Sequence, residues 1–147
     1  MPMHTEQVDL LKVQVHPKRA AMGAAAASAC RRRILEAVAR RNVCRMIFAA
    51  APSQNELLAE LRAAKGIPWE RVEAFHMDEY HGLQQEAPQR FSRFLRRALF
   101  DHVALKTMHF LDVGGLPISD EMRRYAFLMN SAPIDIVCLG IGENGHI

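Results

Sequence analysis

Residues 134–147 read IDIVCLGIGENGHI, a short apolar run (134–139) followed by a loop that holds three glycines. A continuous apolar run of this length is typical of a strand buried on both faces of a parallel sheet. Runs of the same character occur at 45–51 and 72–77, and 107–111 predicts a shorter strand. Four strands of one buried sheet are therefore expected.

Helix-forming segments lie between these strands. Alanine, arginine and leucine, which all favour helices, dominate 18–41, and Asn42 is a plausible stop. Further helices are predicted at 54–64, 89–102 and 120–130, the last with Ser119 as its N-cap. This alternation predicts a single α/β domain with a Rossmann-like three-layer fold and a mainly parallel sheet.

The composition is that of a soluble globular protein, with 147 residues, 50% hydrophobic residues, 24% charged residues and a formal net charge of +3. No apolar run approaches the roughly 20 residues of a membrane span. Residues 1–10 lack the apolar core of a signal peptide. The cysteines, Cys30, Cys44 and Cys138, lack metal-site spacing and indicate reduced thiols in a cytoplasmic protein.

Most of the basic excess precedes residue 50, with arginines at 31–33, 40–41 and 45. Such a cluster indicates either a nucleic-acid surface or the solvated face of a helix. No aromatic residue is interleaved with these arginines, as a single-strand binder would require, and alanines separate them. The helix face is the favoured interpretation, and neither a nucleic-acid partner nor a membrane partner is expected.

Three strand ends carry unusual loops, at 51–55, 77–83 and 140–146. If the strands are parallel and adjacent, these loops meet at one edge of the sheet, where α/β proteins bind ligands. In the last loop, Gly140 and Gly142 let a ligand approach the backbone. His146 is either a general acid–base group or an ordinary surface histidine.

The middle loop begins with two adjacent carboxylates, Asp78 and Glu79. They could serve as acid and base, bind a metal or cap a turn. Because adjacent residues of an extended chain point apart, one carboxylate is expected to face the cleft and the other a supporting partner. His76 and His81 raise a metal possibility, but no second cluster has ligand spacing, so no metal is expected.

The first loop places Ser53 directly before a predicted helix. A hydroxyl beside free amides at a helix start is suited to a phosphate, and it is equally suited to capping the helix. The two roles overlap, so both stay open.

Residues 75–83 (FHMDEYHGL) and 139–147 (LGIGENGHI) resemble the two signature loops of glucosamine-6-phosphate deaminases. These enzymes belong to the glucosamine-6-phosphate isomerase/6-phosphogluconolactonase superfamily, and the resemblance extends from about Ala20 to the end. The Met-Asp-Glu-Tyr form favours a deaminase over a lactonase. The lactonase type of hydrolase remains the alternative, as does a non-catalytic sugar-phosphate-binding module.

The resemblance implies conversion of glucosamine 6-phosphate and water to fructose 6-phosphate and ammonium, without a metal or organic cofactor. Asp78 matches the carboxylate that moves the C2 proton, and His146 matches the histidine that assists ring opening. Asn144 matches the partner of that histidine. Ser53 matches the serine or threonine of the phosphate loop.

Two departures accompany the resemblance. Ala51 and Pro52 replace a usual Gly-Gly pair, and because proline has no N–H, one donor to phosphate is lost. Gln54 or Asn55 could then read a different sugar substituent. The family also continues past the histidine, so 1–147 is expected to be an incomplete N-terminal portion with little activity. A homo-oligomer is compatible with the sequence.

Overall fold

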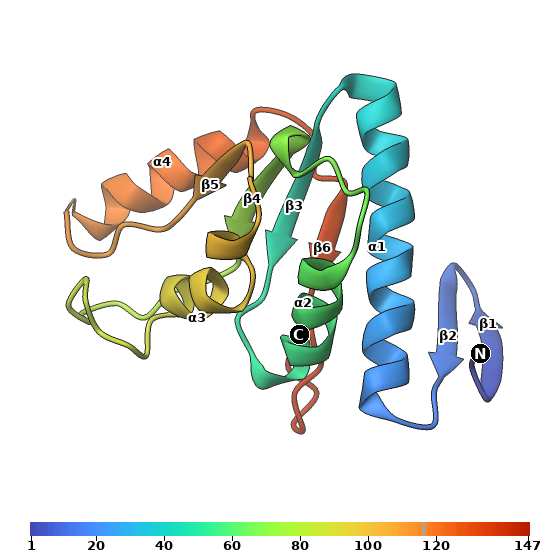
Figure 1. Ribbon diagram of the computed structural model, residues 1–147. Helices are drawn as coiled ribbons and strands as arrows, with labels where there is room; N and C mark the ends of the chain where they lie inside the picture. Colours follow the sequence, from blue (N-terminus) through green and yellow to red (C-terminus); the bar gives the residue numbers. More distant parts are fainter. Residues whose placement is uncertain (116) are drawn as a thin grey trace.

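The computed structural model describes residues 1–115 and 117–147, and it shows an α/β fold, as predicted. Figure 1 shows the arrangement of the elements. The strands are β1 (His4–Val8), β2 (Leu11–Val15), β3 (Cys44–Phe48), β4 (Val72–His76), β5 (Thr107–His109) and β6 (Ile136–Cys138). The α-helices are α1 (Arg19–Arg41), α2 (Asn55–Ala63), α3 (Phe91–Ala98) and α4 (Ile118–Asn130). Short 3-10 helices span Pro52–Gln54, Trp69–Arg71 and Phe100–His102.

The main sheet has four strands in the order β5-β4-β3-β6, and every pair is parallel. The two central strands pair Cys44 with Val72 and Phe48 with His76. Because β4, β3 and β6 are neighbours, the loops that follow them emerge at the same edge, the lower edge of the sheet in Figure 1. The predicted convergence of the three loops is confirmed.

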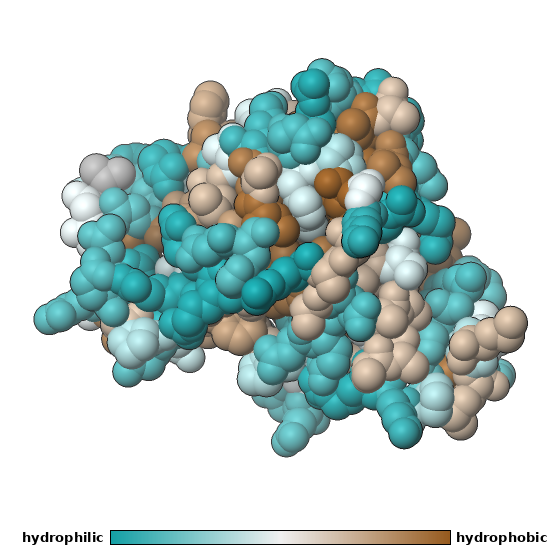
Figure 2. Space-filling model, in the orientation of Figure 1, coloured by the Kyte–Doolittle hydropathy of each residue, from teal (hydrophilic) through white to brown (hydrophobic). Residues whose placement is uncertain are grey.

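Alternate residues of the strands face two different helix layers. The larger core packs Met46 and Phe48 of β3 against Ile34 of α1, with α2 and α3 on the same side. The smaller core joins Ile47 of β3 to Tyr125 of α4, which lies on the other face of the sheet. On the view in Figure 2, brown and pale-brown residues run along the region of α1, in line with its alanine-rich sequence.

Arg45 belongs to the interior and not to a basic surface. Its guanidinium donates hydrogen bonds to the carbonyl oxygens of Leu128, Met129 and Ala132 at the C-terminal end of α4, and it pairs with Glu73. A buried cation at that end of a helix satisfies carbonyl groups that lack partners within the helix. Arg45 therefore fastens α4 to β3.

Several predicted boundaries are corrected. Helix α4 begins at Ile118 after Pro117, so Ser119 lies inside the first turn and does not cap it. Strand β3 ends at Phe48, short of the expected 51, because the chain turns into the 3-10 helix Pro52–Gln54. By contrast, Asn42 ends α1 as expected, with a φ of 60° and its N–H donated to Val38.

An N-terminal hairpin was not predicted. Strands β1 and β2 form a separate antiparallel sheet around a turn in which Asp9 has a φ of 51°. Val8 pairs with Leu11 and His4 with Val15, so Val8, Leu11 and Val15 share one face.

Within the described residues, no helix is both long and apolar enough to cross a bilayer.

Candidate active site

The three converging loops enclose a cleft of about 530 Å³. Of the site residues expected from the sequence, Ser53, Asp78, Gly140, Gly142 and His146 line it. Gln54 and Asn144 do not line it. The cleft thus brings together residues that are up to 93 positions apart in the chain.

Asp78 lies two residues beyond β4, where the ladder to β3 is continued by a hydrogen bond from the Met77 N–H to the Phe48 carbonyl at 3.1 Å. Partial desolvation by the cleft walls raises the pKa of the Asp78 carboxyl, and the nearby charge of Glu79 raises it further. His146 acts on this pKa in the opposite direction. A carboxylate with a raised pKa is a stronger proton acceptor than an ordinary aspartate.

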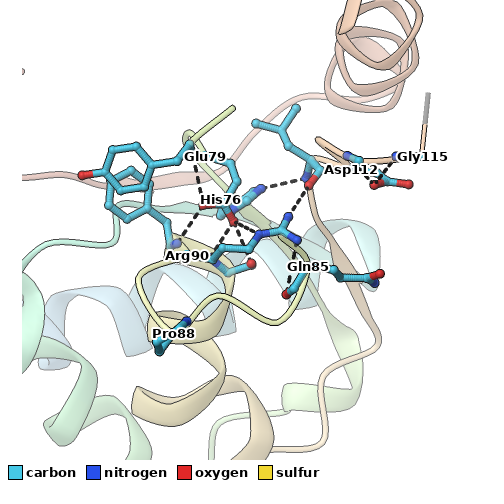
Figure 3. Close-up of polar contacts among 12 residues, drawn as sticks. His76, Glu79, Gln85, Pro88, Arg90, Asp112 and Gly115 are labelled. Carbon is cyan, nitrogen blue, oxygen red and sulfur yellow. Dashed lines mark hydrogen bonds and ion pairs between the residues drawn. The ribbon is translucent and has the colours of Figure 1, made fainter. Parts of the chain in front are cut away.

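Glu79 turns away from the cleft and anchors the loop, as the divergence of adjacent side chains predicts. Its carboxylate accepts hydrogen bonds from the Phe91 N–H at 2.8 Å, the Ser92 N–H at 3.1 Å and the Ser92 hydroxyl at 2.7 Å. It also pairs with Arg90, whose guanidinium donates to the Gln85 carbonyl (Figure 3). Glu79 thereby caps the first turn of α3.

These contacts decide the charge state of Glu79. Burial acts to raise the pKa of the Glu79 carboxyl, but the hydrogen bonds from Ser92 and from the backbone N–H groups of α3 hold it below its usual value. The pair of carboxylates is therefore divided between two tasks. Glu79 is a fixed anion that holds the loop, and Asp78 is the group available to a ligand.

His76 is a core residue and does not reach the cleft. Its Nε2 accepts a hydrogen bond from the Leu111 N–H at 2.7 Å, so its proton belongs on Nδ1, which has no hydrogen-bond partner among the described residues. Burial lowers the pKa of His76 to about 4. Across residues 1–115 and 117–147, no group of three or more histidine, cysteine or acidic side chains is placed to hold a metal ion.

The glycine-rich loop is held by its own backbone. The Gly142 N–H donates to the His146 carbonyl at 2.8 Å, and the Gly145 N–H donates to the Gly142 carbonyl at 2.9 Å. Asn144 accepts a hydrogen bond from the His146 N–H at 3.2 Å through its side-chain oxygen. The expected partner of the histidine therefore contacts its backbone and not its imidazole, and this contact fixes the turn that presents His146.

Ser53 and Gly140 pack closely where two loops meet. A Cβ added to Gly140 would lie 2.5 Å from the Ser53 Oγ, so a larger residue there would require the serine side chain to move. Gln54 is buried behind this contact, and its Nε2 lies 3.3 Å from the Ser53 Oγ. Gln54 therefore supports the serine and is not placed to read a sugar substituent directly.

Arg19 also lines the cleft, and sequence reasoning missed it. It stands at the start of α1, in the segment 18–41 that the sequence marks only as helix-forming. No local pattern indicates that a residue 34 positions before Ser53 reaches the same site, because that proximity depends on how α1 packs against α2.

A family model described as "Glucosamine-6-phosphate isomerases/6-phosphogluconolactonase" matches residues 17–147. The chain belongs to this family. It is 33% identical over 100 residues to a glucosamine-6-phosphate deaminase of Bacillus cereus, covering 68% of this chain and 38% of the relative. It is 44% identical over 77 residues to one of Exiguobacterium sp., covering 52% of this chain and 30% of that relative. The chain therefore matches between 30% and 38% of these relatives' length.

Solved structures of the same family share the fold. A monomeric glucosamine-6-phosphate deaminase aligns with a TM-score of 0.77 at 22% identity, over 88% of this chain and 55% of the other. The 6-phosphogluconolactonase of Plasmodium vivax aligns with a TM-score of 0.80 at 12% identity, over 95% of this chain and 51% of the other. The fold is thus common to members that bear both enzyme names.

Proposed function

We propose that the cleft binds an amino-sugar phosphate and serves the conversion of glucosamine 6-phosphate and water to fructose 6-phosphate and ammonium. The observation that carries this proposal is the division of the carboxylate pair. Of these two carboxylates, Asp78 lines the cleft and has a raised pKa, and His146 lines the same cleft. The deaminase names of the curated relatives support the same reaction.

In this mechanism, His146 transfers a proton at the ring oxygen as the pyranose opens. Asp78 then removes the proton from C2 to give an enolamine and returns the proton to C1, which leaves an imine at C2. Water adds to the resulting imine carbon at C2, and ammonium leaves. A carboxylate that moves one proton between adjacent carbons requires no metal.

The remaining residues hold the substrate and the acid–base groups. Ser53 offers a hydroxyl to the phosphate at the start of the 3-10 helix Pro52–Gln54, and Gly140 and Gly142 let the sugar approach the backbone. Asn144 fixes the turn that carries His146. Glu79 positions Asp78 by tying its loop to α3.

Exchange of the C2 proton tests the role of Asp78. Proton NMR of glucosamine 6-phosphate in D₂O detects even slow turnover, and with the 147-residue chain it should show gradual loss of the C2 signal, together with release of ammonium. Asp78→Asn should slow the exchange by about 100-fold or more, the usual contribution of a general base. Asp101→Asn, which removes an exposed carboxylate outside the cleft, should leave the rate unchanged. An unchanged rate in Asp78→Asn would disprove the role.

The same samples test the alternatives. Hydrolysis of 6-phosphogluconolactone without ammonium release would favour a lactonase, since the family includes both activities. Saturable binding of the sugar phosphate with neither reaction would favour a sugar-phosphate-binding module.

A further inference from the structure

Arg19 lines the cleft, and some of the N–H groups of its guanidinium are already hydrogen-bonded within the protein. Its Nε and Nη2 each donate to one carboxylate oxygen of Glu56 at 2.7 Å, and Nη2 also donates to the Pro52 carbonyl at 3.0 Å. Its Nη1 makes no hydrogen bond within the described part of the chain, and the side chain is 59% exposed. The guanidinium is therefore oriented, with donors left for a ligand.

Close packing of two helices brings Arg19 to this position. Gly23 lies one turn further along α1, and a Cβ there would meet the Glu56 Cβ at 2.5 Å and its carbonyl carbon at 2.8 Å. Glycine inside a helix costs about 1 kcal/mol relative to alanine. The residues that follow Gly23 are alanines, so helix propensity alone would favour alanine at this position too. The glycine lets the start of α1 approach α2, and Arg19 thereby reaches the loop that carries Ser53.

The loop that carries Ser53 has few hydrogen-bond donors of its own for an anion, and Arg19 can supply more. Pro52 has no N–H, so the backbone around Ser53 offers one donor fewer to an anion. Among the described residues that line the cleft, the basic side chains are those of Arg19 and His146. A guanidinium presents several N–H groups in the planar geometry that matches phosphate oxygens.

We infer that Arg19 is the phosphate-recognition residue of this cleft. It binds the phosphate of the sugar together with the Ser53 hydroxyl, and it substitutes for the backbone donor that Pro52 removes. Glu56 holds the guanidinium in orientation. This inference rests on the proposed function in one respect, namely that the ligand carries a phosphate.

Binding measurements on the 147-residue chain test the inference without requiring turnover. Calorimetry or NMR titration would compare glucosamine 6-phosphate, inorganic phosphate and unphosphorylated glucosamine. Arg19→Gln should weaken both phosphate ligands by about 10- to 100-fold, the usual effect of losing a hydrogen bond to a charged group. Glucosamine should bind the variant as it binds the original chain. Lys18→Gln removes the neighbouring positive charge and should leave the affinity for all three ligands unchanged.

Arg19→Lys is a second variant that separates an effect on phosphate binding from an effect on folding. Lysine keeps the charge but offers a single ammonium group, so phosphate affinity should fall between those of arginine and glutamine. Circular dichroism would establish that both variants fold. Equal phosphate affinity in the original chain and in folded Arg19→Gln would overturn the inference, as would equal effects of Arg19→Gln and Lys18→Gln.

The outcomes separate this inference from the proposed function. Phosphate binding that depends on Arg19, without exchange of the C2 proton, would uphold the role of Arg19 and contradict the deaminase proposal. Exchange that depends on Asp78, with phosphate affinity unaffected by Arg19→Gln, would uphold the deaminase proposal and overturn the role of Arg19.

Discussion

Adjacent residues of one loop acquire opposite properties from their surroundings. Desolvation and a neighbouring anion raise the pKa of Asp78, whereas hydrogen bonds from α3 hold the pKa of Glu79 down. Their order in the chain predicts only that the two side chains diverge. Which one faces the cleft depends on α3, whose first N–H groups lie where Glu79 can accept them. The division of roles is thus a property of the fold.

His76 makes stability depend on pH. It is buried, its pKa is lowered to about 4, and the unfolded chain has the ordinary value near 6.5. Between these values the unfolded state binds a proton that the folded state does not, so stability falls as pH drops from 6.5 toward 4. On acidification from pH 7 to pH 4.5, we expect this histidine alone to lower the free energy of unfolding by about 2 kcal/mol.

His76→Gln isolates that contribution, because glutamine keeps an acceptor for the Leu111 N–H but does not titrate. Urea unfolding at several pH values should show a smaller loss of stability on acidification in the variant than in the original chain. His102→Gln, at an exposed position, serves as the control. Equal pH dependence in His76→Gln and the original chain would contradict the assignment.

The site residues that could be predicted are those marked by a pattern in the adjacent sequence. Asp78 directly follows a strand-like run, His146 lies in the loop after another, and Ser53 precedes a predicted helix, so topology alone places them at one edge. Arg19 has no such signal, and Gln54 gives no sign that it is buried behind Ser53. Both depend on contacts between segments distant in sequence.

Among the elements, the contact between α1 and α2 is the one that shapes the cleft. We expect Gly23→Ala to destabilise the chain by about 1–3 kcal/mol, because the methyl group would overlap the Cβ and backbone of Glu56. The better helix propensity of alanine, about 1 kcal/mol, would not compensate. Chemical unfolding measures the difference.

Gly114→Ala is the control for that substitution, since no atom of the described residues lies within 4 Å of a Cβ at Gly114. Its stability should match that of the original chain. The phosphate affinity of Gly23→Ala should also fall, because α1 would carry Arg19 away from the Pro52 loop. A Gly23→Ala variant as stable as the original would show that the helices separate freely.

Strands and helices of the main sheet were predictable because each is strongly apolar or strongly helix-forming. The β1–β2 hairpin was not recognised, although Leu11–Val15 alternates apolar and polar residues, which is a strand signal. Its strands are exposed and, in the part of the chain that the structure describes, pair with each other and not with the main sheet, so no buried run marks them. Helix α4 starts at Ile118 because Pro117 precedes it, and a proline sets a boundary more firmly than Ser119.

For the whole molecule, the open edge of the main sheet is the feature with the largest consequence. β6 pairs with β3 on one side and forms an edge of the sheet on the other. Val137 is 45% exposed, and Leu139 and Ile141 are exposed just beyond it. An edge strand with apolar side chains offers unpaired backbone groups to another chain.

We therefore expect the 147-residue chain to self-associate as its concentration rises, with β6 as the contact. Val137→Lys should shift sedimentation equilibrium toward the monomer, because a lysine on an edge strand opposes pairing with a second strand. Phe127→Lys provides the comparison, since Phe127 is 76% exposed but lies on α4. If Phe127→Lys reduced association as much as Val137→Lys, apolar surface in general would drive it. An effect confined to Val137→Lys would locate the contact at the edge strand.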